Sequence, residues 1–345
     1  MLSGVLVARM DSVGDVLLTG PLVRACAAAA GPVTMLCSPT GAPAAELLPG
    51  VGQVVVGRAP WIEADPGPVE RGAVEAIIAA AAASGADRAV IATSFHQSPL
   101  PLALLLRLAG VERIGAISVD YPGALLDVRH RVDDDIHEVE RSLSLGVAMG
   151  FALPPGDDGR LRLRPDLPAL PAGLAPGYVV VHPGASVTAR AWARRHHRQL
   201  VRELTDAGAS VVVTGAAPEA ALTAEVADGR ALDLGGRLSL PELAAVVAGA
   251  SAVVVANTGP AHLAAAVGTP VVSLYAPTVP AVRWRPWKVP HVLLGDQGVA
   301  CAGCRARVCP VPGHPCLDEV APGAVVEAVG RVRRAEERLP SGVAP

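Results

Sequence analysis

The sequence predicts an α/β protein of two doubly wound halves, each built on a parallel sheet with helices packed against it. Short apolar strands alternate with helical stretches over residues 4–149, and the same alternation returns over residues 178–274. Runs such as Val253–Val255 are apolar without interruption, as expected of a parallel strand buried on both faces. Between the halves, residues 154–177 are rich in proline and glycine, which is typical of an irregular linker.

The first half is expected to span residues 1–153. Its predicted strands are Gly4–Ala8, Val33–Cys37, Gln53–Val56, Arg88–Thr93 and Arg113–Ile117. Its predicted helices are Val16–Ala30, Ala73–Ser84 and Leu100–Leu108. A further helix is expected to begin at Asp133–Asp135 and to run to Met149, because acidic side chains are favourable at a helix N-terminus.

The second half is expected to span residues 178–320. Its predicted strands are Tyr178–His182, Ser210–Thr214, Ala231–Leu234, Ala252–Val255 and Val271–Leu274. Helical stretches are expected at 195–207, 218–227 and 241–249. The C-terminal segment, 321–345, is predicted to hold a helix at Pro322–Leu339 that reaches back towards the first half.

Composition excludes several classes of function. At 345 residues the chain can bury two full cores, and its net charge of -3 does not supply the basic surface of a nucleic-acid binder. Aromatic residues make up only 3%, which argues against base-stacking platforms. No secretory signal or bilayer-spanning run is visible, so a cytoplasmic protein is expected. The segment Leu100–Leu108 is either an ordinary core helix or a place for peripheral membrane contact.

Motifs of two common nucleotide-binding classes are missing. No G-x-G-x-x-G follows a predicted strand and no G-x-x-x-x-G-K-[ST] occurs, which disfavours dinucleotide oxidoreductases and P-loop NTPases. In open α/β sheets the ligand lies beyond the carboxyl ends of the strands. The loops expected to bind a ligand are therefore 9–15, 94–98, 183–191, 215–219, 257–262 and 275–283.

A short helix is predicted directly after the strand Ala252–Val255. Asn257 or Thr258 can cap this helix, Pro260 suits its first turn, and the amides of Thr258–Ala261 would point beyond the end of the strand. Such a helix N-terminus is a candidate anion site, although an ordinary strand–turn–helix would carry the same residues.

Taken in order, the motifs resemble those of glycosyltransferase family 9, the heptosyltransferases of the lipopolysaccharide inner core. Residues 9–21 are similar to the family pattern R-x-D-x-x-G-D-x-x-x-T-x-P. Residues 137–146 look like its interdomain helix, and His182–Ser186 with Arg190 and Trp192 looks like its P-G-A-S followed by a basic residue and Trp. Asn257–Leu263 is close to its D-T-G-P-x-H-L.

The resemblance implies a GT-B fold with an acceptor-binding N-terminal domain and a donor-binding C-terminal domain. It implies a nucleotide-diphosphate sugar donor, typically ADP-heptose, a saccharide or glycoside acceptor, and transfer with inversion. No metal or other cofactor is required for catalysis in that scheme. A different donor, a non-catalytic nucleotide-sugar-binding module and a sugar-nucleotide epimerase are the alternatives.

The resemblance assigns the general base to Asp15. Gly14 would leave room for the backbone to turn and is counted among the residues expected to bind the donor diphosphate. Asp15 could instead serve only to cap the helix that is expected from Val16. Asp11 is the second candidate for the base.

Donor contacts are implied for residues of the second half. Arg190 stands at the family's lysine, and its guanidinium fork suits a diphosphate but cannot donate a proton as lysine can. Glu219 matches a carboxylate that accepts the ribose hydroxyls, and Asn257 replaces the usual aspartate, which leaves the identity of the sugar open. The remaining diphosphate contacts are expected from Ser186, Thr188, Thr258, Gly259, Pro260 and His262.

Four cysteines are crowded near the C-terminus in the spacing C-x2-C-x4-C-x6-C. They are Cys301, Cys304, Cys309 and Cys316. Thiolates at this density suit a structural zinc site, and reduced packing cysteines or a disulfide pair are the alternatives. The other two cysteines, Cys26 and Cys37, are expected in the core.

Overall fold

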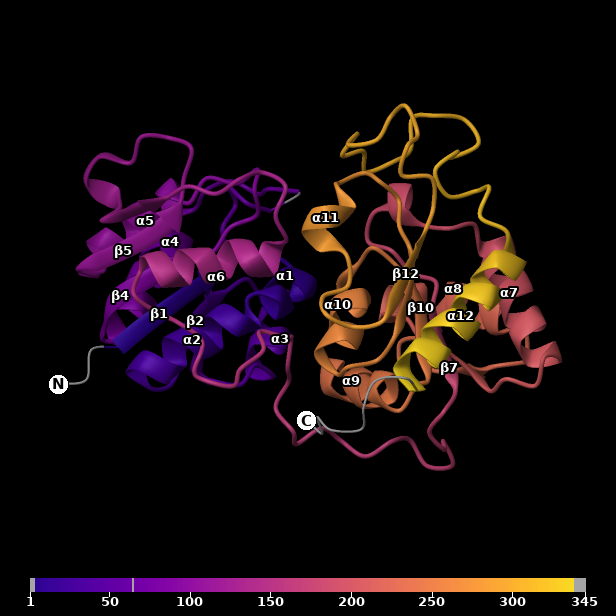
Figure 1. Ribbon diagram of the computed structural model, residues 1–345. Coiled ribbons are helices and arrows are strands. Elements are labelled where there is room, and N and C mark those ends of the chain that lie inside the picture. The colour runs from indigo at the N-terminus through magenta and orange to yellow at the C-terminus, as the bar shows by residue number, and fades with distance from the viewer. Residues whose placement is uncertain (1–3, 64, 338–345) are drawn as a thin grey trace. The chain divides into compact units, whose positions relative to one another are not determined.

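The computed structural model describes residues 4–63 and 65–337 and divides into two compact units. The units comprise residues 1–164 and 165–345, so the division falls inside the proline- and glycine-rich segment 154–177. Within the described residues each unit contains one six-stranded parallel sheet flanked by helices (Figure 1). The predicted α/β class with two halves is therefore confirmed.

The first sheet has the strand order β3-β2-β1-β4-β5-β6. Its strands are β1 (Gly4–Arg9), β2 (Val33–Cys37), β3 (Val51–Val56), β4 (Ala86–Ile91), β5 (Arg113–Ile117) and β6 (Val128–His130). Because β1 pairs with both β2 and β4, the winding of the chain reverses between β1 and β4. This reversal places the loops that follow β1 and β4 next to each other. The last strand, β6, is absent from the sequence prediction.

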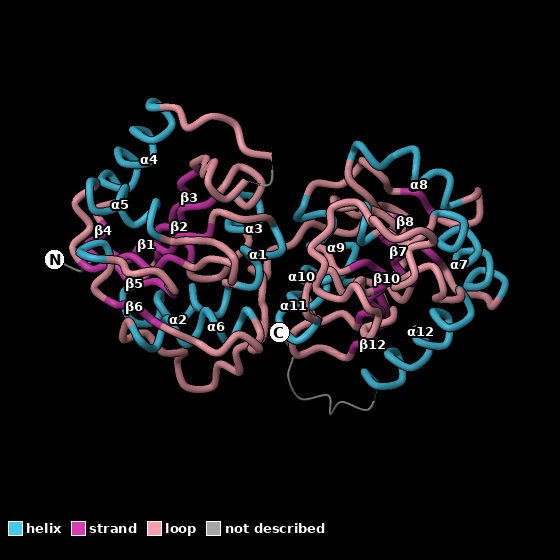
Figure 2. The backbone as a smooth tube through the Cα atoms, turned by 90° about the horizontal axis from the view of Figure 1, so that it is seen from above, coloured by secondary structure: helices cyan, strands magenta, loops and turns pink. Residues whose placement is uncertain are grey.

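Helices cover both faces of the first sheet. They are α1 (Val13–Leu18), α2 (Gly20–Ala30), α3 (Ala42–Glu46), α4 (Arg71–Ala83), α5 (Leu100–Leu108), the 3-10 turn η1 (Gly123–Leu125) and α6 (Glu138–Ala148). Figure 2 shows α4 and α5 on one side of the sheet and α2 and α6 on the other. Leu102 and Leu106 of α5 are buried in the core, so α5 is a core helix with some exposed leucines.

Two predicted helix starts in the first unit are wrong. The helix expected over Val16–Ala30 begins at Val13 and is interrupted at Thr19, so that Asp15 lies in the first turn of α1. The helix expected from Asp133 begins instead at Glu138. His137 fixes this start, because its Nδ1 accepts the Val139 amide while its own amide donates to Glu140 Oε2.

The second sheet repeats the same topology, with the order β12-β11-β10-β7-β8-β9. Its strands are β7 (Val179–His182), β8 (Val211–Val213), β9 (Leu232–Asp233), β10 (Ala252–Ala256), β11 (Val271–Leu274) and β12 (His291–Leu294). Here the winding reverses between β7 and β10, which are paired directly. The edge strand β12 is absent from the sequence prediction.

Helices also cover both faces of the second sheet. They are η2 (Thr188–Arg190), α7 (Arg194–Asp206), η3 (Ala217–Glu219), α8 (Ala220–Ala227), α9 (Leu240–Ala248), α10 (Gly259–Ala266), α11 (Ala281–Trp284) and α12 (Pro322–Glu337). In Figure 2, α9 and α10 lie on one side of this sheet and α7, α8 and α12 on the other. No helix in residues 4–63 or 65–337 combines the length and apolarity needed to cross a membrane.

The C-terminal helix α12 packs within the second unit. Val325, Ala328, Val329 and Val332 are buried in the core that β10, β11 and α7 also line, and Figure 1 shows α12 beside α7. This packing buries the apolar face of α12 within the second unit, and the expectation that the C-terminal segment reaches back towards the first half stays a prediction. Leu339, the predicted end of the helix, lies outside the described residues.

We expect Val329→Ala to lower the free energy of unfolding of the second unit by about 2 kcal/mol. Val329 is 3% exposed, and the loss combines ~0.8 kcal/mol for each buried methyl group with the cost of a cavity. Denaturant unfolding followed by circular dichroism measures the change. Val119→Ala is the matched control, since Val119 is 86% exposed and its truncation should leave stability unchanged. Equal stability of the two variants would contradict the packing of α12.

Candidate functional site

Most of the predicted site residues lie at the carboxyl ends of the strands where the winding reverses. In the first unit, Asp11 and Asp15 follow β1. In the second unit, Arg190 follows β7 and Asn257 follows β10. Ligands of doubly wound sheets bind at such reversals, so each unit has a candidate site of its own.

A buried arginine, Arg9, organises the candidate site of the first unit. It is the last residue of β1 and is 1% exposed. Its Nη2 donates to Asp15 Oδ1 at 3.1 Å and to Ser94 Oγ at 2.8 Å, and its Nη1 donates to Glu138 Oε2 at 3.4 Å. The Asp11 carboxylate lies 2.7 Å from Nε. One guanidinium thus holds three carboxylates, which come from the loop after β1, from α1 and from α6.

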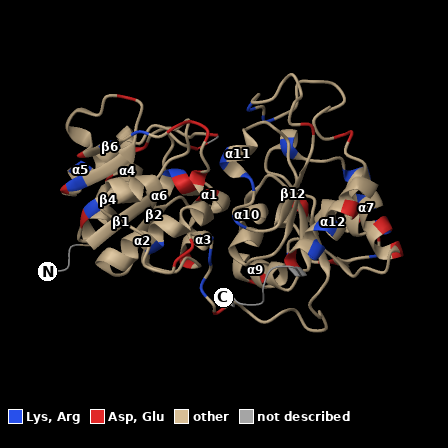
Figure 3. Ribbon diagram, viewed as in Figure 1, with Lys and Arg blue, Asp and Glu red and all other residues tan. Residues whose placement is uncertain are grey.

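A second arginine completes this ionic cluster. Arg141 Nη1 lies 3.6 Å from Glu138 Oε1 and also donates to the Thr93 carbonyl at the end of β4. Burial raises the pKa of the Glu138 carboxyl, and the two nearby guanidinium groups oppose that rise. Figure 3 shows acidic and basic segments side by side where α6 begins. The helix that resembles the interdomain helix of the family is therefore anchored through Arg9 to the first turn of α1, which contains Asp15.

The two candidate bases differ in their access to solvent. The Asp15 side chain is 21% exposed, and its Oδ2 accepts a hydrogen bond of 2.8 Å from Ser12 Oγ. The Asp11 side chain is only 8% exposed and accepts a hydrogen bond from the Gln97 amide. Burial raises the pKa of Asp11 to about 6, against the opposing effect of Arg9. Asp15 is therefore the carboxylate that a substrate can reach, while Asp11 is part of the buried support.

Gly14 and the cap of the helix differ from the sequence expectation. Gly14 is buried inside α1 and does not adopt a positive φ, so it does not form the predicted turn. Ser12 occupies the N-cap position. Asp15 therefore does not cap a helix that begins at Val16, and its carboxylate is held by Arg9 and Ser12 instead.

Arg190 is the corresponding cation of the second unit, but its surroundings are different. It lies in η2 and is half-buried. Its Nε donates to Thr278 Oγ1 at 3.2 Å and its Nη1 donates to the Asn257 carbonyl at 3.4 Å. Both acceptors are uncharged, and no ion pair involves Arg190 in the described part of the chain. The side chain therefore keeps its positive charge uncompensated where the loops after β10 and β11 meet.

The Asn257 side chain forms two hydrogen bonds with the backbone of a neighbouring loop. Its Nδ2 donates to the Ala276 carbonyl at 3.1 Å and its Oδ1 accepts the Ala276 amide at 3.3 Å. The side chain is buried and joins the loop after β10 to the loop after β11. An aspartate could make only the second of these bonds, because an ionised carboxylate has no donor.

The N-terminus of α10 offers fewer amides than the sequence suggests. Thr258 takes the N-cap position, but its amide donates to Ala256 and the Ala261 amide donates to the Thr258 carbonyl. Pro260 has no N–H. Within the described chain, Gly259 alone among these four keeps an amide without a backbone acceptor. His262 is buried inside α10.

Glu219 is held at the ends of β7 and β8. Its Oε2 accepts the Ala216 amide at 2.7 Å and lies 3.9 Å from His182 Nε2. The carboxylate covers Gly184 so closely that a Cβ at this position would lie 2.1 Å from Oε1. A larger residue at 184 would therefore displace the Glu219 carboxylate from this position. Burial lowers the pKa of His182, with Glu219 opposing the shift.

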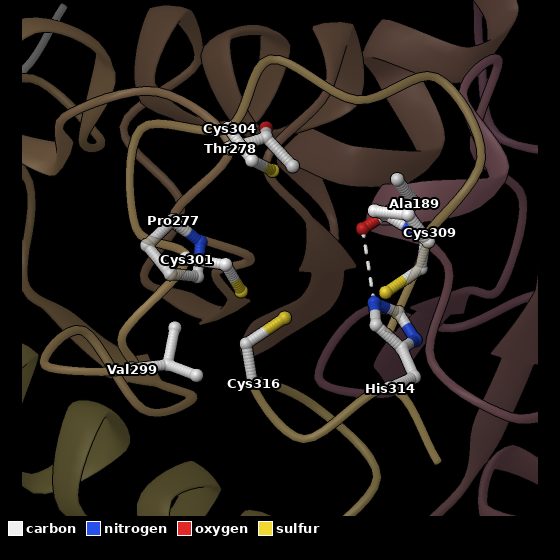
Figure 4. A pocket seen from close by; sticks show the side chains of 10 residues that line it. Ala189, Pro277, Thr278, Val299, Cys301, Cys304, Cys309, His314 and Cys316 are labelled. Carbon is white, nitrogen blue, oxygen red and sulfur yellow. Dashed lines mark hydrogen bonds between the residues drawn. The ribbon is translucent and has the colours of Figure 1, made fainter. Parts of the chain in front are cut away.

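The predicted hydroxyl donors, Ser186 and Thr188, are exposed after β7. Thr188 Oγ1 donates to the Arg307 carbonyl at 3.1 Å, which ties η2 to the cysteine-rich segment. The four cysteines of that segment line one small pocket, which is shown in Figure 4. Cys26 and Cys37 are buried in the core, as predicted.

Sequence reasoning missed the residues that support Asp15. Arg9 is the first residue of the motif at residues 9–21, but the sequence does not indicate which carboxylates its side chain pairs with. Its partner Glu138 is 129 positions away in the sequence. An arginine at the end of an otherwise apolar strand is the one signal in the sequence that could have indicated a buried ionic cluster.

Comparisons with known proteins identify the family of the chain. The family model described as glycosyltransferase family 9 (heptosyltransferase) matches residues 95–314. Lipopolysaccharide heptosyltransferase 3 of Escherichia coli (strain K12) is 32% identical over 164 residues, 44% of this chain and 47% of that protein. The chain thus aligns with about half the length of such curated relatives.

Solved structures share the fold over nearly the whole chain. A glycosyl transferase family 9 protein from Veillonella parvula DSM 2008 has a TM-score of 0.77 at 14% identity and covers 96% of this chain and 97% of its own. The E. coli heptosyltransferase WaaC with ADP-2-deoxy-2-fluoro heptose has a TM-score of 0.72 at 23% identity and covers 95% of this chain and 99% of its own. The fold is therefore GT-B, and because the family model matches more than half of its length, the chain belongs to glycosyltransferase family 9.

Proposed function

We propose that the protein is an inverting glycosyltransferase that transfers heptose from ADP-heptose to a hydroxyl of a saccharide or glycoside acceptor. The observation that carries the proposal is the Asp15 carboxylate, which is partly exposed and is oriented by Arg9 and Ser12. Membership of the family supports sugar transfer. Its relatives are named lipopolysaccharide heptosyltransferases, and WaaC was solved with an ADP-heptose analogue, which supports the choice of donor.

We assign the acceptor to the first unit. The Asp15 carboxylate would accept the proton of the acceptor hydroxyl while that oxygen attacks the anomeric carbon of the donor sugar. The bond between this carbon and the diphosphate oxygen breaks in the same displacement, which inverts the configuration. Arg9 and Ser12 hold the carboxylate in one orientation, so that little reorganisation accompanies the proton transfer.

We assign the donor to the second unit. Arg190 is directed by uncharged oxygens and would pair with the diphosphate as negative charge develops on the leaving group. The Gly259 amide at the start of α10 would add a second donor. Glu219 would accept the ribose hydroxyls. These groups supply the charge stabilisation within the chain, so we propose transfer without a catalytic metal.

A cytoplasmic location belongs to the same proposal, with peripheral contact at the inner face of the membrane when the acceptor is lipid-linked. The support is the naming of the relatives as lipopolysaccharide heptosyltransferases. The exposed Leu104 and Leu108 of α5 are the apolar side chains available for such contact in the first unit.

We expect Asp15→Asn to lower kcat by ~10²–10⁴-fold, the usual contribution of a general base, because the amide cannot accept the proton. Donor affinity should change little. Steady-state kinetics and ADP-heptose binding by calorimetry measure the two effects separately. Asp133→Asn is the matched control on an exposed acidic residue of the same unit. Unchanged turnover in Asp15→Asn would falsify its role as the base.

We expect Arg190→Ala to lower kcat/KM by about 10- to 100-fold, because hydrogen bonds to a charged group contribute ~1.5–3 kcal/mol. Arg190→Lys should recover part of the loss, since the ammonium keeps the charge but not the fork of donors. Arg194→Ala is the control, because its side chain is 71% exposed and lies in the same basic run. If Arg194→Ala and Arg190→Ala behave alike, Arg190 has no special role at the donor.

We expect Asn257→Asp to lower the thermal unfolding temperature, because a carboxylate opposite the Ala276 carbonyl loses a donor and adds repulsion. Asn257 acts here on the backbone, so relative turnover of ADP-heptose and other nucleotide sugars should stay the same. Differential scanning fluorimetry and a donor panel measure the two effects. A reversed donor preference would show that Asn257 contacts the sugar.

The alternative functions separate in one assay with a panel of donors and acceptors. A transferase with another donor makes product only with that nucleotide sugar. An epimerase converts donor when acceptor is omitted. A non-catalytic binding module binds nucleotide sugar but yields no product in either case.

A further inference from the structure

We propose that Cys301, Cys304, Cys309 and Cys316 bind a single zinc ion as a structural tetrathiolate site. These residues belong to the segment between β12 and α12, which contains little regular structure. All four line the same pocket, together with Ala189 and Thr278 from the strand-end loops of the second unit. The described structure records all four as free thiols.

The size and chemistry of the pocket suit a metal ion. Its volume is about 10 Å³, which is close to the space of one water molecule. A water would need two to four polar partners. Besides the four cysteines, the two polar residues of the lining are Thr278 and His314, whose Oγ1 and Nε2 atoms are already hydrogen-bonded within the protein. Thiolate sulfur is a soft ligand that favours zinc, and four such ligands satisfy its tetrahedral preference.

One ring nitrogen of the neighbouring histidine is already engaged, and the four thiols by themselves complete a tetrahedral set of ligands. His314 Nε2 donates to the Ala189 carbonyl at 3.0 Å, as the dashed line in Figure 4 marks. In the same view Cys301 and Cys316 point towards each other, while the Cys309 sulfur lies beside His314. No three donors already stand in a metal-binding arrangement within the described residues. Zinc binding therefore includes a rotation of side chains such as Cys309 towards the pocket.

The backbone between the first two cysteines is already folded into a turn. The Gly303 amide donates to the Pro277 carbonyl at 2.7 Å, and the Arg305 amide donates to the Thr278 carbonyl at 3.0 Å. Arg305 has a φ of 52°, a left-handed conformation that costs a non-glycine residue free energy and persists only when its surroundings enforce it. A metal held by Cys301 and Cys304 would provide that constraint.

Binding is an exchange of protons for the metal and involves no oxidation. Each thiol loses its proton, four Zn–S bonds form, and four protons are released to solvent. A disulfide between Cys301 and Cys316 is the competing outcome, since it would remove two of the four ligands.

The proposed zinc would stabilise the segment that contacts the neighbours of Arg190. The Arg307 carbonyl accepts a hydrogen bond from the Ala189 amide at 3.0 Å, and His314 Nε2 donates to the Ala189 carbonyl. Thr278, which accepts from Arg190, is itself bonded to Arg305 through its carbonyl. Any effect of zinc on turnover depends on the proposed glycosyltransferase function. The binding of zinc to the four thiols is independent of that function.

The test measures metal in the full chain, purified without a histidine tag from zinc-supplemented medium. We expect one zinc ion per chain by inductively coupled plasma mass spectrometry. Cys301→Ser/Cys304→Ser should weaken zinc binding by more than about tenfold, since even changes outside the ligand shell cost ~10–100-fold. Cys26→Ala is the matched control, a buried cysteine outside the cluster, and should keep full zinc.

A second measurement covers the case in which the double variant does not fold. Wild-type protein stripped with a chelator should take up Co²⁺ and develop the intense visible absorption of a tetrahedral thiolate complex, and zinc should displace it. Absence of zinc together with absence of cobalt uptake would overturn the site. Iron in place of zinc, full zinc in Cys301→Ser/Cys304→Ser, or a Cys301–Cys316 disulfide by mass spectrometry would also overturn it. None of these readouts depends on glycosyl transfer.

Discussion

The buried guanidinium of Arg9 is the constraint on which the first unit depends. A charge that is 1% exposed is tolerated only when it is paired, and here Asp11, Asp15 and Glu138 supply the partners. These partners come from different elements, so the pairing fixes the loop after β1, the first turn of α1 and the start of α6 together. The orientation of Asp15 is therefore a property of the whole cluster.

The fold follows from the sequence where burial is uniform. Strands such as β7 and β10 are buried along their whole length, and a continuous apolar run identifies them. The edge strands β6 and β12 are half-buried, so their residues carry no comparable pattern. The predicted start of α6 is wrong because two signals compete in the sequence. The acidic residues Asp133–Asp135 favour an earlier start, whereas the observed start depends on the hydrogen bonds of the His137 cap, which the sequence does not reveal.

The site is predictable only in part, for a related reason. Topology places the residues after β1, β7 and β10 at strand ends, so Asp15, Arg190 and Asn257 could be found from motif positions. The hydrogen-bond and ion-pair partners of these side chains cannot be predicted in the same way. The engagement of Asn257 with Ala276 and of Arg9 with Glu138 depends on long-range packing, which leaves no local pattern in the sequence.

The two arginines illustrate how the same side chain serves opposite purposes. Arg9 is surrounded by three carboxylates, so its charge is neutralised and it can act only by orienting them. Arg190 is held by Thr278 Oγ1 and the Asn257 carbonyl, which fix its direction without cancelling its charge. An arginine that is positioned by neutral oxygens in a half-buried setting attracts anions more strongly than one already paired. This difference is why we propose the diphosphate site in the second unit and the base in the first.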